Sequence, residues 1–199
     1  MIPRHLVIAV AVMLLAVLIL GFYAGRVRNR VTELPPTAQD TRPVAPPAAG
    51  PTERVTLFVA SDDAGVLRAQ SANIPLPAAR QQRAEELLRA LLGIYLGKDS
   101  PHVLAPGSEV RAVYLVDPGL AVIDLNAAFA NGHRSGILEE ELTITSLIQT
   151  LTANIPDILR VKILVEGHDR DTLAGHVDLS DVFDVGAVAQ VAGQLQGTP

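Results

Sequence analysis

Residues 109–125 read EVRAVYLVDPGLAVIDL and carry the clearest structural pattern of the chain. Two apolar runs, Glu109 to Val116 and Leu120 to Leu125, lie on either side of Asp117-Pro118-Gly119. Proline presets φ for a turn and glycine accepts a positive φ, so the tripeptide favours a tight connection between two strands. The stretch therefore predicts a β-hairpin.

The segment after this hairpin predicts a helix and one more strand. Asn131-Gly132 marks a loop, and Pro156 ends the helix that follows. Residues 160–166 form a strand candidate closed by Gly167. The helix is predicted from apolar residues at the helical period, namely Ile137, Ile144, Leu147, Ile148, Leu151 and Ile155.

A second hairpin and a second helix are predicted upstream. Residues 55–60 and 66–74 are strand candidates around the turn residues 62–65. The helix after them has an apolar stripe formed by Ala84, Leu87, Leu88, Leu91, Leu92, Tyr95 and Leu96. The order is ββαββαβ. It predicts an α+β fold with one mostly antiparallel or mixed sheet and both amphipathic helices packed on one of its faces.

The N-terminal part contains a long apolar run. Residues 6–25 read LVIAVAVMLLAVLILGFYAG, twenty positions without a charge. A helix of that length measures roughly 30 Å, the thickness of a bilayer's hydrocarbon core. A cleavable signal peptide is the alternative, but its apolar region is usually about 7–15 residues long and ends in an A-x-A-like pattern. We expect an uncleaved transmembrane helix before the folded domain.

The sequence thus divides into five regions. Residues 1–5 are a short flank and residues 6–25 the anchor, whose flanking arginines do not decide its orientation. Residues 26–54 form a proline-rich linker without a periodic apolar pattern, which we expect to stay extended. Residues 55–184 are the globular domain, and residues 185–199 a flexible tail with a short helix as the alternative.

Composition excludes several classes of protein. The chain has no cysteine, which excludes a thiol nucleophile, a lipidated cysteine and a thiolate metal site. The net charge is −5 and no basic stripe is present, so we expect no nucleic-acid partner. Four Phe, three Tyr and no Trp leave few stacking platforms for bases or sugars.

Asp124 is the most conspicuous candidate for chemistry. It lies inside an apolar strand, where a carboxylate must be exposed, paired or hydrogen-bonded. One interpretation is a catalytic base. The interpretation we favour is that Asp124 and Asn126 accept backbone N–H groups where the strand ends.

Residues 168–171, His-Asp-Arg-Asp, form the densest polar cluster. A metal or acid–base site there competes with a solvated loop, which we favour. No two of the five histidines have the i,i+4 spacing of a helical zinc site, and no H-E-x-x-H sequence occurs. We therefore predict no catalytic, cofactor-binding or metal-ligating residue and no cofactor.

The order and spacing of these elements resemble the GerMN domain family of sporulation and spore germination proteins. The resemblance covers roughly residues 55–183 in a single copy, and it rests on residues 55–58, 122–126 with Phe129, 139–152, 161–167 and 175–180. It implies a bacterial, extracytoplasmic domain that acts in assemblies at the cell envelope. It implies no established catalytic residue.

These observations lead to one expected function and two alternatives. We expect a membrane-anchored, non-enzymatic domain outside the bacterial cytoplasmic membrane that binds or scaffolds an envelope protein, a second copy of itself or the cell wall. One alternative is a peptidoglycan hydrolase with Asp124 and Asp178 in acid–base roles. The other is a small-ligand binder, which needs an apolar pocket with convergent polar groups.

Overall fold

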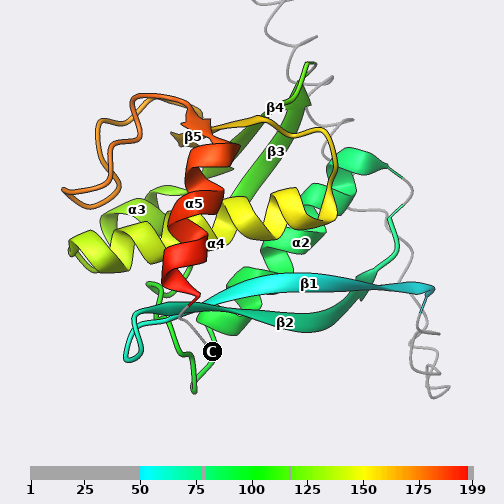
Figure 1. The fold of residues 1–199 in the computed structure, drawn as a ribbon, viewed down its shortest axis with the longest axis horizontal. Coiled ribbons are helices and arrows are strands. Elements are labelled where there is room, and N and C mark those ends of the chain that lie inside the picture. The colour runs from blue at the N-terminus through cyan, green and yellow to red at the C-terminus, as the bar shows by residue number, and fades with distance from the viewer. Residues whose placement is uncertain (1–49, 78, 117, 197–199) are drawn as a thin grey trace, which may run out of the picture. The chain divides into compact units, whose positions relative to one another are not determined.

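The computed structural model describes residues 50–77, 79–116 and 118–196. Pairs of consecutive strands are followed by helices along the chain, as Figure 1 shows. Their order is β1 (Thr52–Ser61), β2 (Val66–Pro75), α2 (Arg80–Tyr95), β3 (Val110–Val116), β4 (Leu120–Leu125), α3 (Ala127–Asn131), α4 (Ile137–Asn154), β5 (Arg160–Val165), β6 (Phe183–Asp184) and α5 (Val185–Leu195).

The strands form two separate sheets. β1 and β2 make a two-stranded antiparallel sheet in continuous register from Thr52 opposite Pro75 to Ser61 opposite Val66. The second sheet has the order β3-β4-β5-β6, with an antiparallel hairpin between β3 and β4 as predicted. β4 and β5 are parallel, because α3 and α4 carry the chain back between them.

The predicted single sheet is therefore wrong, and side chains on the free edge of β1 explain why. Asn154 accepts a hydrogen bond from the Thr56 N–H (3.1 Å) and donates one to the Thr56 carbonyl (2.7 Å). The Phe58 N–H donates to the Thr150 hydroxyl (2.9 Å), and the Ala60 N–H donates to the Tyr95 phenol (2.9 Å). Side chains of α4 and α2 thus satisfy the groups that a third strand would otherwise pair.

The predicted fold class needs a second correction, because it included a transmembrane helix. Across residues 50–77, 79–116 and 118–196, every helix falls short of the length and apolar character that a bilayer crossing requires. The predicted helix over residues 6–25 lies outside the described residues. Over the residues that the structure describes, the fold is an α+β domain of two sheets and four helices.

The apolar stripes of both predicted helices form the core, with one exception in each. The α2 stripe is buried from Ala84 to Tyr95, whereas Leu96 is exposed just after the helix ends. The α4 stripe is buried except for Ile137, whose side chain is 69% exposed at the first turn. In Figure 1, α4 crosses the middle of the domain, where it contacts β1, α2 and α5.

The backbone at Gly119 packs closely against residues 157–160, and a side chain at this position would prevent that contact. Gly119 has φ +73°, and its carbonyl accepts hydrogen bonds from the N–H groups of Leu159 (2.8 Å) and Arg160 (3.0 Å). A Cβ atom at this position would lie 2.9 Å from the Asp157 carbonyl oxygen. Glycine is therefore required by both conformation and space.

We expect Gly119→Ala to lower the free energy of unfolding by about 2 kcal/mol, measured by urea denaturation. Gly93→Ala is the matched control, because Gly93 lies exposed within α2 and an added methyl group there would meet no other atom within 4 Å. The control should gain about 0.5–1 kcal/mol from helix propensity. Equal effects of the two substitutions would contradict this account of the turn.

Candidate functional site

α4 buries polar side chains as well as apolar ones, and their partners define the candidate site. Glu140, Thr143, Ser146 and Thr150 are each 0% exposed. A buried polar group is costly unless it is hydrogen-bonded, so each of these residues must have a partner from elsewhere in the chain or within its helix. Glu140 and Thr143 obtain theirs from distant loops.

Glu140 holds the loop of residues 174–177 on α4. Its Oε2 atom accepts hydrogen bonds from the backbone N–H groups of Ala174 (3.1 Å), His176 (3.1 Å) and Val177 (2.9 Å). Its Oε1 atom lies 2.9 Å from Nδ1 of the His176 ring. Burial raises the pKa of Glu140, but these hydrogen bonds outweigh burial and bring the pKa to about 2. The side chain is therefore ionised at neutral pH.

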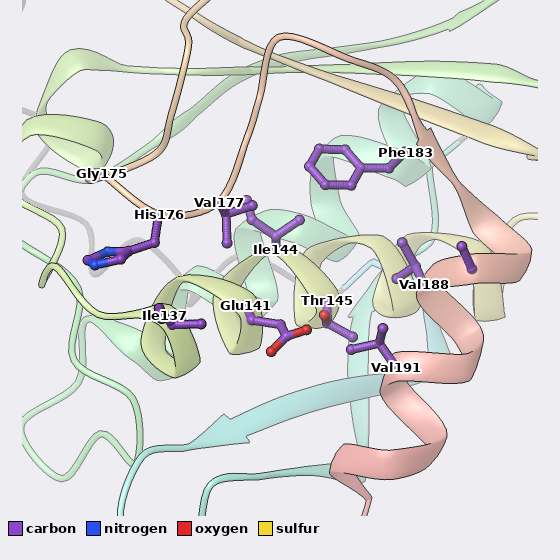
Figure 2. A pocket seen from close by; sticks show the side chains of 11 residues that line it. Ile137, Glu141, Ile144, Thr145, Gly175, His176, Val177, Phe183, Val188 and Val191 are labelled. Carbon is purple, nitrogen blue, oxygen red and sulfur yellow. The ribbon is translucent and has the colours of Figure 1, made fainter.

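This loop forms one wall of a groove with a volume of about 590 Å³. Figure 2 shows α4 as its floor and α5 as its second wall, with the loop across from them. We call this the α4–α5 groove, and its lining residues are Ile137, Glu141, Ile144, Thr145, Gly175, His176, Val177, Phe183, Ala187, Val188 and Val191. Most of the lining is aliphatic or aromatic, and Glu141 brings a carboxylate into it.

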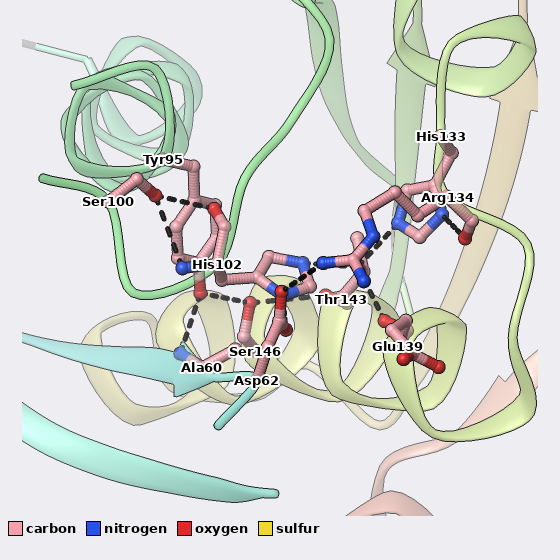
Figure 3. Close-up of polar contacts among 10 residues, drawn as sticks. All are labelled: Ala60, Asp62, Tyr95, Ser100, His102, His133, Arg134, Glu139, Thr143 and Ser146. Atoms are coloured by element: carbon pink, nitrogen blue, oxygen red, sulfur yellow. Dashed lines mark hydrogen bonds and ion pairs between the residues drawn. The ribbon is translucent and has the colours of Figure 1, made fainter. Parts of the chain in front are cut away.

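A second polar arrangement lies around Thr143, as Figure 3 shows. The Thr143 hydroxyl lies 2.6 Å from Nε2 of His102 and 2.7 Å from Nε2 of His133. Nδ1 of His102 lies 2.5 Å from Oδ1 of Asp62, whose other oxygen is 3.3 Å from Arg134. We call these five residues the histidine cluster.

Hydrogen-bond chemistry assigns the protons at His133. Its Nδ1 atom lies 2.7 Å from the Arg134 carbonyl oxygen, which can only accept, so Nδ1 carries a proton. Burial lowers the pKa of His133, so the ring is neutral and its Nε2 atom accepts. The Thr143 hydroxyl proton then has two acceptors within reach, His133 Nε2 and the Glu139 carbonyl at 2.8 Å, and Nε2 of His102 lies within hydrogen-bond distance of the same oxygen.

Asp62, His102 and Thr143 follow the carboxylate–imidazole–hydroxyl order of a catalytic triad, but they are not placed to act as one. A triad nucleophile must be reached by its substrate. Thr143 is 0% exposed and His102 is 2% exposed. The histidine cluster instead connects the β1–β2 turn and the loops before β3 and α4 to the α4 helix through hydrogen bonds.

Asp124 and Asn126 have the partners that the sequence predicts. Asp124 accepts a hydrogen bond from the Gly167 N–H (2.8 Å) and pairs with Arg111 (2.9 Å). Asn126 accepts from the N–H groups of Glu109 (3.1 Å) and Phe129 (2.9 Å), the latter as the N-cap of α3. These residues close the end of β4.

The hydrolase alternative requires Asp124 and Asp178 to act together, and the structure gives them separate partners. Asp178 is exposed and accepts hydrogen bonds from the N–H (2.7 Å) and hydroxyl (2.6 Å) of Ser180, which lower its pKa. Within the described ranges no hydrogen bond or shared partner connects the two carboxylates. Each carboxylate therefore has its own hydrogen-bond partners in the folded domain.

The polar run at residues 168–171 lies in an anchored loop. Asp169 pairs with Lys162 (2.8 Å), and Arg170 donates to the Thr172 carbonyl and to Asn131 (2.8 Å each). Over the part of the chain that the structure describes, no group of three or more His, Cys, Asp or Glu residues is placed to hold a metal ion.

Sequence reasoning missed Glu140 and Thr143, although a signal for both was present. Glu140 precedes Ile144, Leu147 and Leu151 by 4, 7 and 11 positions, so it lies on the apolar face of the predicted helix. Thr143 precedes Leu147 by four positions and shares that face. Polar residues at core-facing positions of a helix indicate buried hydrogen-bond networks.

The described residues thus form an α+β domain with a groove between α4 and α5 and with two buried hydrogen-bond networks, which hold neighbouring loops on α4. The family model Germane, described as sporulation and spore germination, matches residues 56–171. The chain belongs to the Germane family, which confirms the predicted resemblance to GerMN domains. No curated protein matches the sequence.

One solved structure shows a similar fold at low sequence identity, and two others are similar to this chain at lower TM-scores. The tandem GerMN domains of the sporulation protein GerM from Bacillus subtilis are 22% identical, with a TM-score of 0.51 over 67% of this chain and 46% of that chain. This chain thus spans about half of that structure. The first GerMN domain of the same protein is 20% identical, with a TM-score of 0.48 over 66% of this chain and 97% of that chain.

A lipoprotein described as putative, from Clostridium perfringens, is 22% identical, with a TM-score of 0.45 over 71% of this chain and 92% of that chain.

Proposed function

We propose that this Germane-family domain is a non-enzymatic binding domain of the bacterial cell envelope, outside the cytoplasm, and that the α4–α5 groove is its binding site. The groove is the observation that carries the proposal. Its volume of about 590 Å³ lies within the range typical of ligand sites, about 300–1,000 Å³. The extracytoplasmic location rests on the GerMN resemblance and on the family's association with sporulation and spore germination.

The groove is built before any partner arrives. Glu140 fixes the loop wall through three backbone hydrogen bonds and the His176 ring. The opposite wall is held by Val188 and Ala192 of α5, which are 8% and 1% exposed. A preorganised site loses less conformational entropy on binding, so the same contacts give a higher affinity.

Thr143, His102 and Asp124, the residues considered above for catalysis, are not part of the groove lining. Thr143 and His102 are buried, and Asp124 pairs with Arg111 at the end of β4. A groove lined mainly by aliphatic and aromatic side chains, with Glu141, Thr145 and His176 as its polar residues, favours recognition through shape and apolar contact. We therefore assign binding, with a protein as the partner and a small apolar ligand as the second candidate.

Site-specific photo-crosslinking in the source bacterium tests this function. A photoreactive amino acid in place of Val191, which lines the groove, should give a discrete protein adduct. The matched position is Val103, which is 55% exposed and not part of the lining. The adduct should disappear when Ile137→Lys is added, because a charge then lies at the groove's rim. Equal crosslinking from both positions, or none from Val191, would refute the assigned site.

A further inference from the structure

The α4–α5 groove combines an apolar floor with an acidic group, and that combination limits what can occupy it. Ile137 and Ile144 lie seven residues apart on α4, with Glu141 between them on the same face. Figure 2 shows the Glu141 carboxylate directed into the space between α4 and α5, close to Thr145 and Val191. Among the described residues, Glu141 has no hydrogen-bond or ion-pair partner at its side chain.

The groove lining is acidic rather than basic, since Glu141 is the one Asp, Glu, Lys or Arg among its described lining residues. The chain as a whole has a net charge of −5. The α5 wall carries no charge at all, since Val185–Leu195 reads VGAVAQVAGQL. An excess of carboxylates attracts cationic partners and speeds their association.

The apolar lining of the groove can receive the apolar face of a helical partner. Ile137 leaves 69% of its surface in water at the open end of the groove, and Val177 and Phe183 continue the apolar lining along the loop. Helix-in-groove recognition places apolar residues of the bound helix at positions i, i+3, i+4 and i+7. A Lys or Arg beside that stripe would reach Glu141.

We propose that the α4–α5 groove binds an amphipathic, basic helical segment of a partner protein, with the apolar face of that helix on Ile137, Ile144 and Val191 and a Lys or Arg paired with Glu141. This inference rests on the proposed function and names the chemistry of its partner. Anionic lipid headgroups are disfavoured, because the Glu141 carboxylate in the groove repels a negatively charged surface.

The test uses the full-length chain and two synthetic helical peptides of identical apolar pattern, one built of Leu and Lys and the other of Leu and Glu. Fluorescence anisotropy should show at least tenfold tighter binding of the Leu/Lys peptide. Glu141→Lys should remove that preference, and Ile137→Lys should weaken binding at least tenfold. Both side chains are solvent-accessible, so neither variant depends on repacking the core.

A matched variant separates groove binding from general attraction to an acidic protein. Asp99→Lys makes the same charge change at an exposed position outside the groove lining, and it should alter the affinity less than twofold. An Asp99→Lys effect as large as that of Glu141→Lys would overturn the proposal. Groove-dependent binding to phosphatidylglycerol vesicles would overturn it in favour of a membrane surface.

The groove as a binding site and the basic helix as its occupant can be refuted separately. If the Val191 crosslink captures a partner but the peptides bind equally well, the groove is a binding site and the basic helix is the wrong occupant. If the crosslink fails as well, the proposed function falls with it.

Discussion

Glu140→Gln is expected to lower the free energy of unfolding by about 3 kcal/mol at pH 7, since the pKa of Glu140 is about 2 in the folded domain and 4.5 is its ordinary value. All three backbone N–H groups donate to Oε2 of the carboxylate, and a neutral amide oxygen in that place is a weaker acceptor. The amide NH₂ then takes the place of Oε1, against Nδ1 of His176 and the Gly136 N–H. The amide NH₂ of Gln would face donors where an acceptor is needed. The loop at residues 174–177 should then detach from α4, and the groove should lose a wall.

The pH dependence gives this prediction a second readout. A carboxylate whose pKa is lowered by folding stabilises the folded state at pH values above its ordinary pKa. The contribution of Glu140 is therefore complete above about pH 4.5 and is lost as the pH falls towards about 2. The Gln variant should lack this part of the acid-induced loss of stability.

Urea denaturation between pH 2 and pH 7 measures both effects, and amide hydrogen exchange of Ala174, His176 and Val177 reports on the loop. Glu139→Gln is the control, because Glu139 is the neighbouring residue on α4 and is less deeply buried. Its effect should stay within about 0.5 kcal/mol, as for most surface substitutions. A Glu140→Gln protein as stable as Glu139→Gln would show that the loop is held by other contacts.

Thr143→Val is expected to destabilise the domain by about 3 kcal/mol, since each buried polar group left without its partner costs about 1–3 kcal/mol. Valine keeps the shape of threonine but removes the hydroxyl that lies against His102 and His133. Both Nε2 atoms would then be buried against a methyl group. The packing volume stays the same, so the loss reports on the hydrogen bonds.

Thr152→Val is the matched control within the same helix. The Thr152 hydroxyl donates to the Ile148 carbonyl (2.9 Å), as the Thr143 hydroxyl does to Glu139, but it contacts no histidine. Its replacement should cost less than about 1 kcal/mol. Equal losses in the two variants, measured by urea denaturation at pH 8, would contradict the histidine cluster as a stabilising unit.

As the pH is lowered, the contribution of the histidine cluster to the free energy of unfolding should decrease at a higher pH than the contribution of Glu140. Burial lowers the pKa of His133 from its ordinary value of 6.5, so the folded state prefers the neutral ring. The stabilisation that the neutral His133 ring contributes is present above about pH 6.5 and decreases as the pH falls below that value. The two groups thus act in the same direction over successive pH ranges.

Local patterns in the sequence were sufficient for much of the fold. The helical period of Leu87, Leu88 and Leu91 reports burial on one face, because side chains three and four residues apart share a side of a helix. The Pro118-Gly119 turn between two apolar runs specified the β3–β4 hairpin. The same order of elements carried the resemblance to the GerMN family, which the family match confirms.

The candidate site was less accessible from the sequence. Asn126 could be predicted as a strand-end acceptor, because its partner Phe129 lies three residues further along the chain. For Asp124 the need for a partner could be predicted but not the partner itself, since Gly167 lies 43 residues away. The groove could not be predicted, since its floor comes from α4, whereas its walls come from the loop before β6 and from α5, which follow in the chain only after β5.

The sequence by itself therefore determined which residues form helices and hairpins and which faces are apolar, since both depend on neighbours within a few positions. Only the tertiary structure decided that the β1–β2 hairpin forms its own sheet. Asn154 and Thr150 hydrogen-bond the edge of β1 from 98 and 92 residues away, in the place that another strand would take. Likewise, Glu140 helps to form the groove only because folding places the backbone N–H groups of the loop at residues 174–177 against its carboxylate.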